Sequence, residues 1–429
     1  MKKTLILTAA LGLAGATPLL AVDLFVTGST AFRANVYAAS TKLFDVPPAI
    51  TYGDAAHGGD ANNNAKTASW CMTGTVSNSI SALGMTPLTI HALFSGSVQG
   101  LQTVEQGTKL VFSTPTAGTY ITNTPTIGFS DCSGTSTPYP ATGSFSEENV
   151  CVQPFVMCKS VAGGGLTNIN NVTWEQLRYA ISPGRIPLSA WTTKGTDHSS
   201  YVYLVERTKD SGTRRCELAQ EQFGYNAACT VYLYDNVTNN IFFKPSGTAI
   251  IGSAGVNNAN LNWGSGYVSG GNVATELGYN NANNQAIAML SIGDAKGITG
   301  TPWSQVLPFN GVWPTAAGAG ISGNTGTNDF SPISQGVYTC WGYEVVVFPN
   351  VDPSSLNADQ NLTATQLGSQ QSPGTILGVL NAQTIINGGS PLVGSIENEI
   401  ELSKPTGATA IRLSDMVSQR GSVGGTIAP

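Results

Sequence analysis

The chain has 429 residues, a formal net charge of -6, 10% charged residues and 41% hydrophobic residues. This acidic balance excludes a general affinity for nucleic acid or anionic lipid, so we expect no nucleic-acid partner. Since no stretch approaches the ~20 uncharged apolar residues of a membrane helix, we also expect no direct insertion into a membrane. No cysteine or histidine spacing indicates a metal site, and none of the three histidines lies near a candidate nucleophile. We therefore expect no metal, no cofactor and no hydrolytic triad.

Residues 1–21 have the layout of a secretory signal peptide, with two lysines, an apolar run and then small residues. Cleavage would follow Ala16 or Ala21. The apolar run is too short to span a bilayer. We therefore expect a soluble exported protein, located in the periplasm or outside the cell, whose remaining length calls for two lobes.

Three segments in the first third of the chain each predict a strand that ends in polar residues. Residues 22–32 predict a strand, a Gly28-Ser29-Thr30 turn and the start of a helix, and residues 88–107 repeat this order around a Ser-Gly-Ser turn. A third strand, over 126–131, ends on Ser130-Asp131. Ligands of open α/β sheets gather at the carboxyl ends of strands, so the three strand ends predict one shared binding edge.

The middle of the chain predicts a second set of elements. Residues 150–158 are typical of a buried strand, in which Pro154 indicates an edge or a crossing segment. Thr173 and Gln176 stand in capping-box register, which predicts a helix that Pro183-Gly184 closes. A further strand is predicted over 201–206.

The run ERTKDSGTRR, residues 206–215, joins that strand to a helix that we expect to end at Gly224. A helix N-terminus offers free backbone N–H groups and a partial positive charge, so it can hold an oxyanion. Gly212 lets the backbone approach closely, and Arg207 can make a planar two-pronged contact. The alternative is that Ser211-Gly212-Thr213 only caps the helix and turns the chain.

The remaining sequence predicts fewer elements. Residues 235–285 are rich in Asn and Gly, which predicts an elaborated loop region around one or two elements. Strands are predicted over 287–295 and 337–349, and a helix over 375–384.

Six motifs run collinearly between residues 24 and 225: GSTAF, FSGSVQG, IGFSD, QPFV, TWEQLRYAISPGRIPLSAW and RTKDSGT. Their order resembles that of the periplasmic phosphate-binding protein of bacterial phosphate ABC importers, in the type 2 periplasmic-binding-protein superfamily. The resemblance implies a two-lobed α/β fold, with mixed sheets flanked by helices and a ligand cleft between the lobes. It also implies inorganic phosphate as the ligand and an ABC importer membrane complex as the partner.

Position by position, the resemblance implies contacts to phosphate from both lobes. The second lobe would supply Arg207, Ser211, Gly212 and Thr213, and the first lobe Asp131, Ser95 or Ser97, and Phe32 with its neighbours Thr30 and Ala31. The family usually has Thr directly before the Phe. This chain has Ala31 there, so the hydroxyl comes from Thr30 instead or is absent.

Asp131 adds a physical criterion for the ligand. A buried carboxylate repels a bound anion unless the anion carries a proton that it can donate to the carboxylate. Phosphate keeps a proton at neutral pH and sulfate does not, so Asp131 would select phosphate or arsenate. The alternative is that Asp131 caps the turn that follows it.

The architecture we expect has residues 22–148 plus 345–429 in lobe I and residues 149–344 in lobe II. The predicted pocket has donors and one acceptor but no acid–base pair, which predicts binding without enzymatic activity. The alternative function is that of a secreted surface or matrix structural protein that retains the binding-protein fold. Cys216 and Cys229 are the candidate pair for a disulfide in an oxidising compartment.

Overall fold

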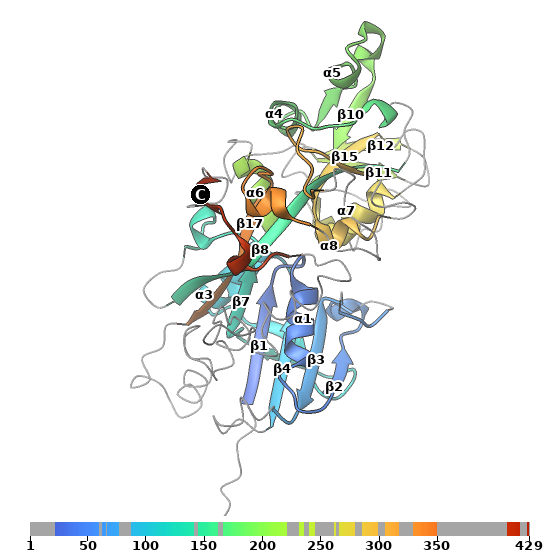
Figure 1. Cartoon of the computed structure of the whole chain (residues 1–429). Helices are drawn as coiled ribbons and strands as arrows, with labels where there is room; N and C mark the ends of the chain where they lie inside the picture. The colour runs from blue at the N-terminus through green and yellow to red at the C-terminus, as the bar shows by residue number, and fades with distance from the viewer. Residues whose placement is uncertain are drawn as a thin grey trace, which may run out of the picture.

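The described residues are organised around a mixed sheet of 11 strands (Figure 1). The structure is a computed structural model of the whole chain, and it describes residues 22–59, 62–65, 67–76, 87–140, 145–161, 166–220, 231–235, 240–244, 261–262, 266–278, 285–298, 305–316, 329–349, 410–420 and 427–428. The strand order is β2-β3-β4-β1-β7-β17-β8-β15-β10-β9, and β16 pairs with β8.

The strands of this sheet are β1 (Val22–Gly28), β2 (Ala49–Tyr52), β3 (Ser69–Gly74), β4 (Leu88–Leu93), β7 (Ile127–Ser130), β8 (Phe145–Lys159), β9 (Arg185–Pro187), β10 (Tyr201–Leu204), β15 (Ala286–Ser291), β16 (Val306–Leu307) and β17 (Trp341–Pro349). Smaller hairpins are formed by β5 (Leu110–Ser113) with β6 (Tyr120–Asn123), β11 (Val231–Asp235) with β12 (Asn240–Lys244), β13 (Leu261–Asn262) with β14 (Gly266–Tyr267), and β18 (Gln419–Arg420) with β19 (Ile427–Ala428).

The sheet has two halves, and each contains parallel strands. We call β2, β3, β4, β1 and β7 the β1 half, and β15, β10 and β9 the β15 half. In the β1 half, β1 lies between β4 and β7 and is parallel to both. In the β15 half, β10 is parallel to β15. Figure 1 shows β1 pointing toward the β15 half, so the carboxyl ends of β1 and of its parallel neighbours β4 and β7 face that half, whereas β3 runs the opposite way.

Two strands connect the halves. The first part of β8 pairs with β17, and its last five residues pair antiparallel with β15. β17 also pairs antiparallel with β7. The strand predicted over 150–158 is therefore longer than expected, because one continuous ladder serves both halves. The strand predicted over 337–349 begins only at Trp341. The lobe boundaries at 148/149 and 344/345 stay a prediction.

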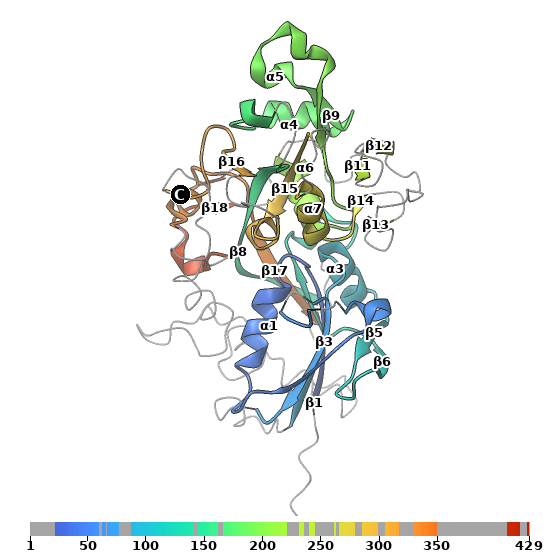
Figure 2. The ribbon, with the colours of Figure 1, turned by 90° about the vertical axis from the view of Figure 1, so that its right-hand side faces the viewer.

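Helices cover both faces of the sheet, as the side view in Figure 2 makes clear for α1 and α3. The helices are α1 (Arg33–Thr41), α3 (Ser97–Glu105), α4 (Trp174–Ile181), α5 (Ser189–Thr192), α6 (Gly212–Gln220), α7 (Gly270–Leu277), α8 (Ile292–Ala295) and α9 (Ser331–Ser334). Val36 and Ala39 of α1 belong to the core of the β1 half, and Leu101 and Val104 of α3 pack against Val347 on the opposite face. The predicted α/β class, with a mixed sheet flanked by helices, is confirmed.

A local sequence signal predicted the start of α4 correctly. Thr173 accepts from the backbone N–H of Gln176 at 3.2 Å, and the Gln176 side chain accepts from the backbone N–H of Thr173 at 2.9 Å, which completes the predicted capping box of α4. The strand predicted over 287–295 is wrong in its last four residues. Ser291 accepts from the backbone N–H of Asp294 at 3.2 Å and so starts α8 instead.

Some predictions lie outside the described residues. These are the signal peptide over 1–21, the helix end at Gly224 and the helix over 375–384. Among the residues that the structure does describe, no helix has both the length and the apolar character needed to cross a membrane.

Candidate functional site

The site forms where the carboxyl ends of β4, β1 and β7 meet the β15 half. Each of these parallel strands runs into a polar turn: Ser29-Thr30 after β1, Ser95 to Ser97 after β4, and Asp131 after β7. From the β15 half, the chain beyond β10 delivers Arg207 and the start of α6. The three polar strand ends that were expected to share one edge therefore do lie at one edge, and binding there stays a prediction.

Asp131 is the most enclosed charged group of this edge, with 2% of its surface exposed. The Ser29 hydroxyl donates to Oδ1, and the Thr213 hydroxyl lies 3.4 Å from Oδ2. The backbone N–H of Asp131 donates to Ser97 Oγ at 3.3 Å. Asp131 thus accepts from hydroxyls on both sides of the junction. It does not cap the turn that follows, since Ser133 caps the 3-10 helix η2 (Gly134–Ser136).

Ser29 is a site residue that the sequence resemblance missed. Its hydroxyl is fully buried, bonds Asp131, and accepts from the backbone N–H groups of Ala31 at 3.2 Å and Phe32 at 3.3 Å. The sequence signal was present, because Ser29 lies inside the turn between β1 and α1, where a hydroxyl commonly bonds the backbone ahead of it. Phe32 itself packs in the core, with its ring 5.9 Å from that of Phe129.

Arg207 lies at the same junction and is 4% exposed. Its Nη2 donates to Thr30 Oγ1 at 3.3 Å and to the Val268 carbonyl at 3.1 Å, while Nε donates to the Tyr267 carbonyl at 3.3 Å. Burial lowers the pKa of the guanidinium, and nearby carboxylates, led by Asp294 and Asp131, oppose that shift. Thr30 therefore places a hydroxyl against Arg207, directly before Ala31 in the chain.

The start of α6 is packed directly against the β1 half. A Cβ added at Gly212 would lie 2.5 Å from Ser97 Oγ and 2.8 Å from Asp131 Cβ, so only glycine fits here. The backbone N–H of Val98 donates to the Asp210 carbonyl at 3.1 Å, which ties α3 to the loop before α6. Ser211 Oγ accepts from the backbone N–H of Arg214 at 3.3 Å, as a helix cap does.

The other cations of the run 206–215 have different places. Arg214 is buried, lies 3.7 Å from Glu206 and donates to the Arg207 carbonyl at 3.0 Å. Arg215 donates to the Ser136 carbonyl at 2.7 Å, whereas Lys209 is exposed. Arg214 therefore holds the backbone that presents Arg207, and Arg215 ties α6 to the turn that follows β7.

A cavity of about 780 Å³ lies beside this cluster. Thr30 and Ser95 line it from the β1 half, and Ser269 and Asp294 line it from the β15 half. Within the described part of the chain, Ser95 Oγ is buried without a hydrogen-bond partner. Asp131, Arg207 and residues 211–213 do not line this cavity. Thr30 and Val268 both line the cavity and accept hydrogen bonds from Arg207, so they connect the cavity to it.

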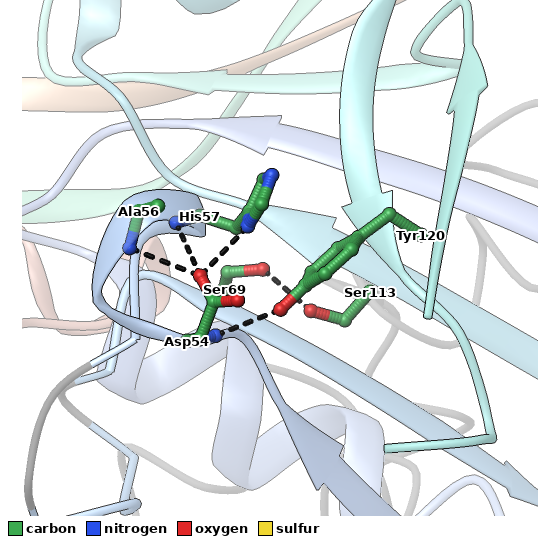
Figure 3. A network of polar contacts seen from close by, with 6 residues as sticks. All are labelled: Asp54, Ala56, His57, Ser69, Ser113 and Tyr120. Carbon is green, nitrogen blue, oxygen red and sulfur yellow. Dashed lines mark hydrogen bonds and ion pairs between the residues drawn. The ribbon is translucent and has the colours of Figure 1, made fainter. Parts of the chain in front are cut away.

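One wall of the cavity is fixed by a network around Asp54 (Figure 3). Its Oδ1 caps the 3-10 helix η1 (Ala55–His57) and lies 2.7 Å from His57 Nδ1, and these contacts, with Tyr120, lower the pKa of Asp54. The His57 ring stacks on Tyr120 with centroids 3.8 Å apart. The network ties η1 to Tyr120 of β6, and the residues directly after η1, Gly58 and Gly59, line the cavity.

Of the two cysteines predicted to form a disulfide, Cys216 lies within the described residues. Cys216 is buried in α6, and its thiol donates to the Asp131 carbonyl at 3.3 Å. Burial raises the pKa of this thiol well above its usual range. Cys229 lies outside the described residues, so a bridge between the two stays a prediction.

Among known proteins, this chain is similar to several solved structures. No family model and no curated protein matches the sequence. A structure from Clostridium perfringens, described as a phosphate ABC transporter substrate-binding protein with bound phosphate, has a TM-score of 0.43 and 10% identity, covering 91% of this chain and 99% of that one. An ABC-type phosphate transport receptor from Vibrio cholerae has a TM-score of 0.38 and 14% identity, covering 80% and 93%. Both of these solved structures are described as proteins of phosphate transport.

Proposed function

We propose that the protein is an exported solute-binding protein that binds inorganic phosphate between Asp131 and Arg207, for uptake by an ABC importer. The observation that carries this proposal is the convergence of the two groups on one buried junction. Asp131 comes from the β1 half, Arg207 comes from the β15 half, and hydroxyls of Ser29, Thr30 and Thr213 lie against them.

The chemistry of this junction suits a tetrahedral, partly protonated oxyanion. Arg207 supplies a planar pair of donors, and the hydroxyls of Ser97, Ser211 and Thr213 add further polar contacts. Asp131 would accept the proton that phosphate retains at neutral pH. Binding requires Gly212 to move away from Ser97 and Asp131, and a hinge in β8 and β17 provides the simplest way to open that gap.

Arg207, Asp131 and the hydroxyls around them would bind phosphate without catalysing a reaction. An arginine, hydroxyls and one carboxylate that accepts a proton hold an anion without attacking it. Phosphate would enter through the cavity beside Thr30 and Ser95, and closure of the halves would bury it. The signal peptide over residues 1–21 would place this binding in the periplasm or outside the cell.

A thermal-shift panel of phosphate, arsenate, sulfate and molybdate tests the proposal. A ligand present at 100 times its Kd stabilises the folded state by about 2.7 kcal/mol. We expect phosphate and arsenate to raise the melting temperature and sulfate to leave it unchanged. No shift with any anion at millimolar concentration would contradict the proposal and favour the surface or matrix protein that retains this fold. Turnover of a phosphoester would instead point to a hydrolase.

A further inference from the structure

Glu344 is a buried acid that the proposed site does not yet use. It lies in β17, is 0% exposed, and within the described part of the chain neither carboxyl oxygen accepts a hydrogen bond from a donor group. An ionised carboxylate in such surroundings would be strongly destabilised. A protonated Glu344 would avoid this cost, and its O–H would then need a neighbouring group that accepts a hydrogen bond.

The group next to the Glu344 side chain is the carboxylate of Asp131. β17 and β7 are antiparallel with Val345 opposite Ser130, so the next position on each strand places Glu344 opposite Asp131. Side chains that face each other in this way have Cβ atoms about 5 Å apart. The pairing between β17 and β8 changes register between Glu344 and Val345, so Glu344 lies at an irregularity of this ladder.

The two carboxyl groups have unequal surroundings. Asp131 has hydroxyls of Ser29 and Thr213 beside its oxygens and Arg207 nearby. Within the described part of the chain, the titratable groups around Glu344 are Asp131, Cys132, Cys216 and Cys151, the last directly opposite it on β8. Burial raises the pKa of Glu344 well above its ordinary value, and the charge of Asp131 raises it further. A proton held by this pair therefore resides on Glu344.

We propose that Glu344 is a permanently protonated positioning residue, whose O–H donates to the Asp131 carboxylate and fixes the oxygen that Asp131 presents to the ligand. The pair then carries one negative charge rather than two. A doubly charged pair would repel phosphate more strongly than a singly charged one. The effect of Glu344 on phosphate binding therefore rests on the proposed function. No proton is transferred in this arrangement: Glu344 keeps its own and phosphate keeps its own.

Infrared spectroscopy tests the protonation state without any ligand. We expect the wild-type protein at pH 9 to show the carbonyl stretch of a protonated carboxylic acid, and E344Q to lack it. E105Q is the matched control, because burial and the charge of Glu147 raise the pKa of Glu105 to only about 7, so Glu105 is ionised at pH 9. A wild-type spectrum without a band that E344Q removes would overturn the proposal.

Phosphate titration tests the positioning role. E344L removes the donor, and we expect it to weaken phosphate binding by about tenfold or more, the scale of a hydrogen bond to a charged group. E344Q keeps an uncharged N–H donor of nearly the same shape, so it should restore most of the lost affinity. Equal losses in E344Q and E344L would contradict positioning through a donated hydrogen bond. If E344L does not fold, the phosphate affinity of E344Q and the infrared band of the wild-type protein test the role of Glu344.

The two proposals can fail separately. If the wild-type protein binds no phosphate but the band is present and vanishes in E344Q, the protonated pair stands and the proposed function falls. If the wild-type protein binds phosphate but has no such band, the function stands and the role of Glu344 is wrong.

Discussion

The Arg207 guanidinium donates to the Thr30 hydroxyl at 3.3 Å, across 177 positions of sequence. This contact joins the chain beyond β10 to the turn after β1, and both residues are buried. Since a buried guanidinium needs its donors satisfied, Thr30 and the carbonyls of Tyr267 and Val268 hold Arg207 in a single orientation. The contact makes the position of Arg207 depend on how the two halves meet.

Replacing Arg207 tests whether it binds the anion. We expect R207A to weaken phosphate binding by about 2 to 5 kcal/mol, the cost of removing one partner of a buried charged pair. R207K should recover only part of this, because the ammonium lacks the planar fork. Isothermal titration calorimetry measures the change. Arg185, whose guanidinium stacks over Tyr201 at 4.1 Å, is the control, and R185A should bind as the wild type does. Equal affinities for R207A and R185A would rule out the role.

Asp131 should set the selectivity between phosphate and sulfate. D131N removes the negative charge and supplies an amide that can donate to a fully ionised oxyanion. We therefore expect D131N to bind sulfate, which the wild-type protein rejects, and to bind phosphate more weakly. Calorimetric titration with both anions gives the selectivity ratio. A ratio that D131N leaves unchanged would count against the carboxylate as the selecting group.

Gly212 should tolerate no side chain. G212A places a Cβ 2.5 Å from Ser97 Oγ and 2.8 Å from Asp131 Cβ, and overpacking of this kind costs about 1 to 3 kcal/mol. G195A is the matched control, since no atom lies within 4 Å of a Cβ at Gly195. Urea unfolding should show the loss for G212A alone. Comparable stability of the two variants would mean that α6 and Ser97 separate easily.

His91 should make stability depend on pH. Burial by itself lowers the pKa of His91, but hydrogen bonds to Asp23, Cys71 and the Ser113 carbonyl outweigh it and raise the pKa to about 10. The unfolded value is about 6.5. Because the folded pKa is the higher one, the stabilisation is complete below about pH 6.5 and is lost as the pH rises toward 10.

Unfolding free energies from urea titrations at pH 6, 8 and 10 measure this loss. H91Q cannot titrate, so the fall in stability between pH 6 and 10 should be smaller than in the wild type. D23N removes the carboxylate that lies 3.5 Å from His91 Nε2 and should reduce the fall in the same way. Parallel curves for all three proteins would show that His91 does not carry the dependence.

The sequence by itself determined the local units of this protein. Strand-turn-helix order around Gly28-Ser29-Thr30, the capping box of Thr173 and the polar end of β7 each depend on residues within a few positions of one another. Such signals act through backbone hydrogen bonds and hydrophobic periodicity, which neighbouring residues decide. The α/β class followed from them, whereas most residues of the proposed site came from the resemblance of the motif order to that of phosphate-binding proteins.

Only the tertiary structure decided which of these units meet. Glu344 lies opposite Asp131 because β17 pairs antiparallel with β7, and no local pattern specifies that pairing or its register. The same holds for Ser29 bonding Asp131 and for Gly212 packing on Ser97, since each contact joins segments distant in the chain. The sequence supplied the donors and carboxyl groups, and strand pairing and burial decided which of them lie next to one another.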